Sequence, residues 1–238
     1  MTDRQQHFVV TGASQGMGRA IAIRLAEAYP GAHLSLLART EESLNEVAAV
    51  CEAHGAEARV YPCDLTVEIS AAGACEQLLA ASGAPALYVN NAGTFLPGGI
   101  RETTFDTWRR QMDINLTSAF HVASRLVPPM IDAGSGHVVF VTSVAAVRGY
   151  PRGLAYCASK HGLLGLARAV REETKTLGLR VTALIPGSTR TSSWDDTDLP
   201  DERFISPEDI AEAVLGVYRL SGRSVVEEML IRPQLGDI

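Results

Sequence analysis

The sequence lacks any long hydrophobic run and has only four cysteines in 238 residues. No stretch approaches the roughly 20 apolar residues of a membrane span, and the first residues lack the apolar core of a signal peptide. The cysteines form no CxxC pair and no cluster with zinc-ligand spacing. We therefore expect no membrane association and no metal site, and reduced structural thiols in a cytoplasmic protein.

Basic charge is also scarce, since 21 Lys and Arg residues stand against 27 Asp and Glu residues, for a net charge of −6. This balance gives no general attraction to nucleic acid or anionic membrane. The sequence has no low-complexity linker, charge block or internal repeat. With 46% hydrophobic residues, the chain suits one globular domain over 1–238.

Short apolar runs alternate with longer segments of helical pattern along the whole chain. The runs expected to form strands are 7–12, 32–38, 57–65, 85–93, 136–143, 179–187 and 225–233. The segments expected to form helices are 18–30, 41–55, 68–82, 104–134, 155–177 and 206–222. This alternation predicts an α/β fold, a single doubly wound Rossmann domain whose seven-stranded, mostly parallel sheet has helices on both faces.

Three glycines, Gly12, Gly16 and Gly18, lie between the first strand and the first helix in "VVTGASQGMGRA". Glycine allows the tight reversal after the strand, and a diphosphate must approach the backbone where a Cβ at position 16 or 18 would obstruct it. The helix N-terminus then offers free N–H groups to the phosphates. A purely structural turn is the alternative, but the strand–turn–helix context favours dinucleotide binding.

The second predicted strand ends in "LLART", where sites that prefer NAD carry an acidic residue for the ribose 2′-hydroxyl. Ala38 occupies that position, followed by Arg39 and Thr40. A guanidinium can pair bidentately with a 2′-phosphate, so this pattern favours NADP(H). The alternative, Arg39 as a solvated surface charge, leaves the missing acid unexplained.

Tyr156 and Lys160 are four residues apart in "AYCASKHG", so both rise from one face of the predicted helix. An ammonium beside a phenol can lower the pKa of the phenol and prepare it as an acid. The pair alone could equally be ordinary helix surface.

These motifs occur in one order: TG-x3-G-x-G, NNAG, an asparagine in the next helix, a serine after the fifth strand, Y-x3-K and PG. In this order and over the whole chain, the sequence resembles the short-chain dehydrogenase/reductase family. The resemblance implies four catalytic residues. Asn115 would help to hold a water in a proton relay, and Ser143 would bind the substrate carbonyl. Tyr156 would be the acid/base, while Lys160 would lower its pKa and hold the nicotinamide ribose.

The resemblance also implies which residues contact the cofactor. They are Gly12, Ser14, Gly16, Met17, Gly18, Arg39, Thr40, Asp64, Leu65, Asn91, Ala92, Gly93, Tyr156, Lys160, Pro186, Gly187, Thr189 and Thr191. Taken singly, Ser143 could be a strand-end cap, Asn115 a helix kink and Asp64 a turn residue. The implied activity is reduction of a carbonyl to an alcohol, with hydride from NADPH and the proton from Tyr156.

The short acidic segment 188–206 corresponds to the family's substrate-covering lid, in which Trp194 would either stack on the substrate or anchor the lid. Our candidates for the pocket wall are Phe95, Leu96, Ala145, Arg148, Tyr150 and Trp194. The last strand ends without the V-D-G-G of many family members, which puts the family's usual C-terminal site contacts in doubt.

The ending "VVEEMLIRPQLGDI", together with "VTSVAA", "YCASK" and the Trp194 segment, resembles a bacterial sepiapterin-reductase-like branch. The small-molecule substrate candidates are therefore a pterin side-chain carbonyl and a 3-oxoacyl compound. Two other functions are weighed: an NADP(H)-binding sensor without turnover, and epimerase or dehydratase chemistry, which normally needs a larger C-terminal domain. Family members commonly pair the helices here at about 104–133 and 155–177, which predicts a homodimer or homotetramer. The apolar row "LLGLARAV" could line that interface or face the protein's own sheet.

Overall fold

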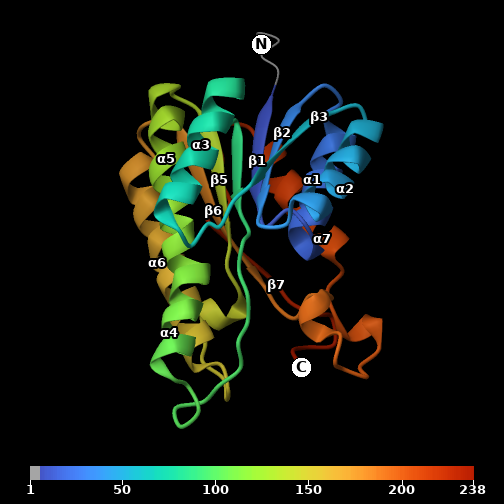
Figure 1. Ribbon diagram of the computed structural model, residues 1–238, viewed down its shortest axis with the longest axis vertical. Helices are drawn as coiled ribbons and strands as arrows, with labels where there is room; N and C mark the ends of the chain where they lie inside the picture. Colours follow the sequence, from blue (N-terminus) through green and yellow to red (C-terminus); the bar gives the residue numbers. More distant parts are fainter. Residues whose placement is uncertain (1–5) are drawn as a thin grey trace.

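Seven strands form one sheet in the computed structural model, which describes residues 6–238. Their order is β3-β2-β1-β4-β5-β6-β7, and every neighbouring pair is parallel (Figure 1). The strands are β1 (His7–Thr11), β2 (His33–Ala38), β3 (Glu57–Pro62), β4 (Leu87–Asn90), β5 (Gly136–Val141), β6 (Leu179–Pro186) and β7 (Glu228–Ile231). The predicted Rossmann fold is confirmed.

Helices cover both faces of the sheet, as the alternation predicts (Figure 1). One apolar cluster joins the sheet to α1 (Gly16–Ala28), α2 (Glu41–Ala53) and α7 (Pro207–Arg219). A second cluster joins the opposite face to α3 (Glu68–Ser82), α5 (Ser118–Asp132) and α6 (Leu154–Thr174). Within β1 the side chains alternate, since Phe8 and Val10 belong to the first cluster and Val9 to the second.

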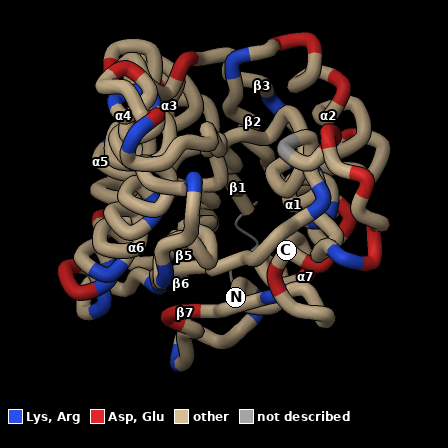
Figure 2. Tube along the Cα trace, turned by 90° about the horizontal axis from the view of Figure 1, so that it is seen from below, with Lys and Arg blue, Asp and Glu red and all other residues tan. Residues whose placement is uncertain are grey.

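The chain crosses from one half of the sheet to the other between β3 and β4, because β1 lies between β2 and β4. At such a point the connections that follow two neighbouring parallel strands run to opposite faces of the sheet. They leave a crevice beyond the carboxyl ends of those strands. Figure 2 looks from below onto this end of the sheet, with α1 and α2 on one side and α4 (Phe105–Met112), α5 and α6 on the other.

The segment 104–134 is not the single helix that we expected. A π-helical turn over Asp113–Thr117 separates α4 from α5. Thr104 caps the N-terminus of α4, because its hydroxyl accepts a hydrogen bond from the Thr107 N–H. The π turn adds one residue to the helical spiral, a feature frequent at functional sites, and Asn115 lies within it.

Candidate active site

A cleft of about 1110 Å³ lies beyond the carboxyl ends of the strands and is lined by residues of the loops that follow β1 to β6. It brings together 22 of the 26 different residues that the sequence singled out: Gly12, Ser14, Gly16, Met17, Arg39, Thr40, Asp64, Leu65, Asn91, Ala92, Gly93, Phe95, Ser143, Arg148, Tyr150, Tyr156, Lys160, Pro186, Gly187, Thr189, Thr191 and Trp194. The four that do not line it are Gly18, Leu96, Asn115 and Ala145.

The glycine turn after β1 packs closely against Asn91 and Ala92 of the loop after β4. Gly12 has a φ of +63°, and a Cβ there would lie 2.9 Å from the Cα of Ala92. The side-chain amide of Asn91 donates hydrogen bonds to the backbone carbonyls of Thr11 (3.0 Å) and Gly12 (3.2 Å). A Cβ on Gly18 would lie 2.2 Å from the Gly12 oxygen. Gly18 is therefore needed for packing of α1 against the turn, and the expectation that it clears space for a diphosphate is corrected.

The N-terminus of α1 opens onto the cleft at Gly16. Gln15 precedes the helix without a side-chain cap, and the first turn carries no acidic residue. The first N–H groups and the positive end of the helix dipole are thus available to an anion. These residues fit the diphosphate of a dinucleotide.

Beyond the glycine turn, the cleft is lined by Arg39 and Asp64 at the ends of β2 and β3. Arg39 is exposed and follows the buried Ala38. The Asp64 carboxylate accepts hydrogen bonds from the Thr66 hydroxyl (2.7 Å) and N–H (2.9 Å), which lower the pKa of Asp64. Asp64 is therefore an ionised turn residue that also faces the cofactor region.

Tyr156 and Lys160 project from the first half of α6 into the cleft. Burial raises the pKa of Tyr156, and a hydrogen bond with Ser143 opposes this shift. Burial also lowers the pKa of Lys160 to about 8. The Lys160 ammonium donates to the Val141 carbonyl at 3.2 Å and lies 5.8 Å from the centroid of the Tyr156 ring.

We expected Lys160 to lower the pKa of Tyr156, but the shift has the opposite sign in the protein without cofactor. The reason is that removal of the phenol from water disfavours the phenolate, while the ammonium is directed to a backbone carbonyl. A phenol with a raised pKa is protonated at neutral pH, which is the form that can donate a proton.

Asn115 lies behind the cleft wall and joins two segments of the site. Its amide nitrogen donates to the Thr94 carbonyl and to the Ser159 hydroxyl, both at 3.0 Å. Its carbonyl accepts from the Thr94 N–H at 2.9 Å. Ser159 in turn donates to the Tyr156 carbonyl at 2.8 Å. Asn115 thus ties the loop after β4 to the helix that carries Tyr156.

The side of the cleft that the sequence predicts for the substrate contains aromatic rings. Phe95 packs edge-on against Tyr156, with ring centroids 5.1 Å apart. Trp194 packs against Phe204 within the lid, at 5.3 Å between centroids. This contact is consistent with Trp194 as an anchor of the lid, although Trp194 also lines the cleft.

Leu96 and Ala145 do not form the pocket wall that we expected. Ala145 is fully buried in the turn after Ser143 and donates its N–H to the Ser143 hydroxyl. The Leu96 N–H donates to the Gln111 side chain at 2.8 Å. Neither residue is among those that line the cleft.

Sequence reasoning missed Gln111 and Asp237. Gln111 is fully buried, and its amide donates to the Thr94 carbonyl at 2.6 Å. Its position four residues before Asn115, on the same helix face, was the available signal. Asp237 lines the cleft from the far end of the chain, and no local pattern marks it.

Comparison with known proteins identifies the family. The model of the short chain dehydrogenases matches residues 6–201. The chain therefore belongs to the short-chain dehydrogenase family and is an oxidoreductase.

Among individual proteins, sepiapterin reductase of Chlorobaculum tepidum is 33% identical over 239 residues, covering 97% of each chain. A metagenomic short-chain oxidoreductase solved in complex with NADP is 34% identical, with a TM-score of 0.85 and 97% of each chain covered. An alcohol dehydrogenase from the archaeon Thermococcus sibiricus, complexed with 5-hydroxy-NADP, is 26% identical, with a TM-score of 0.91 and 98% of each chain covered.

Proposed function

We propose that this protein reduces a carbonyl compound to an alcohol with NADPH. The observation that carries the proposal is the convergence of two hydroxyls, those of Ser143 and Tyr156, on a cleft that also contains an uncapped helix N-terminus. Bound NADPH supplies the hydride. The protein must then bind the carbonyl oxygen and deliver one proton to it.

Ser143 and Tyr156 have complementary parts in this reaction. The Ser143 hydroxyl donates a hydrogen bond to the substrate oxygen, which stabilises the negative charge that develops there. The Tyr156 Oη releases its proton to the same oxygen, so the products are a neutral alcohol and a phenolate. The Lys160 ammonium stabilises that phenolate, and Asn115 holds the helix that positions both side chains.

NADP(H) is the proposed dinucleotide because Arg39 follows Ala38 where an acid would select NAD(H). The remaining cleft-lining residues predicted from the resemblance would hold its phosphates, adenine and nicotinamide. The NADP in the metagenomic relative, at 34% identity, supports this choice.

The substrate candidates are a pterin side-chain carbonyl and a 3-oxoacyl compound. The 33% sequence identity to the sepiapterin reductase of Chlorobaculum tepidum, over 97% of the chain, favours the pterin. The lid 188–206 would cover the substrate as part of a single catalytic domain over 1–238. Within the lid, Arg190 donates to the Trp194 carbonyl at 2.8 Å and pairs with Asp201 at 3.0 Å. These contacts support a lid with an internal structure of its own.

The proposal is tested by NADPH oxidation, followed by absorbance, with sepiapterin, diketones, 3-oxoacyl thioesters and steroid ketones. We expect turnover of at least one carbonyl class and much slower oxidation of NADH. Tight NADPH binding without turnover of any class would contradict the proposed function and favour a sensor.

A homodimer or homotetramer remains a proposal, although the row "LLGLARAV" does not support it. Leu163, Leu164 and Ala167 of that row pack into the protein's own core. Phe120 of α5 is exposed and offers apolar surface for pairing instead. Light scattering at micromolar concentration that found a monomer would reject this proposal.

A cytoplasmic location is also proposed. It is supported by the four cysteines, all of which are free and buried. Across residues 6–238, no helix is both long and apolar enough to cross a membrane.

A further inference from the structure

The segment 232–238, which follows β7, lies against the substrate side of the cleft. Figure 2 shows this end of the described chain near the middle of the face formed by the strand ends. Gly236 has a φ of +87°, and its N–H donates to the Pro233 carbonyl at 2.9 Å. The resulting turn brings Asp237 back beside Arg232 and into the cleft lining.

The Asp237 carboxylate is shared by two arginines. It accepts from Arg232 through Nε at 3.2 Å and Nη2 at 2.5 Å. It also accepts a short hydrogen bond from Nη2 of Arg148. The Asp237 side chain is only 12% exposed, whereas the Arg148 side chain is 47% exposed. Hydrogen bonds to a carboxylate that is shielded in this way are stronger than those of a solvated surface pair.

Arg148 and Asp237 come from two different walls of the cleft. Arg148 is in the loop between Ser143 and Tyr156. Asp237 lies against the turn after β6, because a Cβ on Gly187 would come within 3.3 Å of its Oδ1 and 3.0 Å of Pro233. The Gly187 N–H also donates to the Ile231 carbonyl at 2.7 Å. The contact therefore joins the loop after β5 to the turn after β6.

The contact also sets the charge that a substrate meets. Arg148 and Asp237 both line the cleft, whereas Arg232 does not. Asp237 is a hydrogen-bonding partner for both guanidiniums, and of the two only Arg148 faces the cleft. Without the carboxylate, the Arg148 cation would face the substrate unpaired and would attract an anion.

We propose that Asp237 determines substrate specificity by holding Arg148 on its carboxylate, so that Arg148 is not free to bind an anionic group and the enzyme takes uncharged carbonyl compounds. This inference rests on the proposed carbonyl reduction and specifies its substrate class.

The test compares methyl benzoylformate, an uncharged 2-oxo ester, with benzoylformate, the corresponding anion. The measured quantity is the ratio of kcat/KM for the acid to kcat/KM for the ester. In Asp237→Asn we expect this ratio to rise about tenfold, a factor that corresponds to roughly 1.4 kcal/mol. Arg148→Ala should abolish the rise when it is combined with Asp237→Asn. An unchanged ratio in Asp237→Asn, or an equal rise in the double variant, would overturn the proposal.

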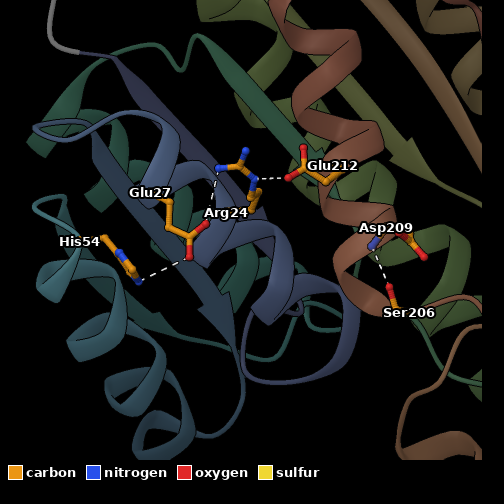
Figure 3. A network of polar contacts seen from close by, with 6 residues as sticks. All are labelled: Arg24, Glu27, His54, Ser206, Asp209 and Glu212. Carbon is orange, nitrogen blue, oxygen red and sulfur yellow. Dashed lines mark hydrogen bonds and ion pairs between the residues drawn. The ribbon is translucent and has the colours of Figure 1, made fainter. Parts of the chain in front are cut away.

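The control is a more exposed ion pair that also joins distant segments, Arg24 with Glu212. Arg24 of α1 pairs with Glu27 of the same helix and with Glu212 of α7 (Figure 3). None of these three residues lines the cleft. Glu212→Gln also removes a carboxylate from an arginine, and it should leave the acid-to-ester ratio unchanged.

Hydrogen exchange provides a readout that needs no turnover. In Asp237→Asn, exchange should increase in peptides from both 144–153 and 232–238, whereas Glu212→Gln should change neither. If the wild type binds NADPH but reduces neither these two compounds nor any of the carbonyl classes screened above, the proposed function fails, and the exchange result alone decides the role of Asp237. Unchanged exchange in the 144–153 peptide would then reject that role.

Discussion

The two sides of the cleft are built in different ways. On the cofactor side, the shape depends on backbone: Gly12 turns the chain, Gly18 packs against it and the helix N-terminus remains uncapped. On the substrate side, walls from distant segments are joined by side chains, as in the Arg148–Asp237 pair, whose members are 89 positions apart. A site made of backbone tolerates few substitutions, whereas a wall made of side chains can change its specificity without loss of the fold.

The largest expected effect is at the point where the two sides meet. Tyr156→Phe removes the proton donor but keeps the buried ring, so kcat should fall by roughly 10²- to 10⁴-fold. NADPH affinity, measured by fluorescence titration, should change little. Retention of more than a tenth of wild-type turnover would mean that another group supplies the proton.

The next effect tests the backbone of the cofactor side. Gly18→Ala places a Cβ 2.2 Å from the Gly12 oxygen, and overpacking of this kind typically destabilises a protein by about 1–3 kcal/mol. Urea unfolding should show the loss. The control, Gly216→Ala, lies on the exposed face of α7 with nothing within 4 Å of the new Cβ. It should stabilise the protein by about 0.5–1 kcal/mol, and equal destabilisation by both changes would contradict the packing argument.

Arg39→Asp tests the side-chain contribution to the cofactor side. Loss of a charged hydrogen-bonding partner of the 2′-phosphate, about 1.5–3 kcal/mol, should lower kcat/KM for NADPH relative to NADH by roughly 10- to 100-fold. Arg223→Asp makes the same charge change at an exposed position outside the cleft. An unaltered NADPH/NADH ratio in Arg39→Asp would refute the 2′-phosphate contact.

The smallest effect is a pH dependence of cofactor binding. Burial lowers the pKa of Lys160 to about 8, so its ammonium is present below that pH and is lost as the pH rises above it. If the ammonium donates to the cofactor ribose, NADPH affinity should be highest below pH 8. It should fall by roughly tenfold for each pH unit well above 8. Calorimetric titration from pH 7 to 9.5 measures this, and Lys160→Met should have a flat profile.

Much of the site was predictable because its motifs are local and follow strands. Gly12 and Gly16, the Tyr156–Lys160 pair and Ser143 all lie in the cleft, since parallel strands bring the residues after their carboxyl ends to one edge. Leu96 and Ala145 do not line the cleft although residues beside them in the sequence do, and Ala145 is fully buried. The sequence did not predict the π turn at Asp113–Thr117, because the helical pattern continues without interruption on both sides of it.

The sequence by itself determined the parallel α/β architecture, the dinucleotide cradle and the reacting pair, because strand alternation, glycine conformation and helical spacing act over a few residues. Only the tertiary structure decided the pKa shifts of that pair and the pairing of Arg148 with Asp237. Burial is the main cause of the pKa shifts of Tyr156 and Lys160. Asp237 and Arg148 are 89 positions apart in the sequence and come into contact only when the chain folds. Desolvation and long-range contacts depend on the whole packed molecule, so no short stretch of residues encodes them.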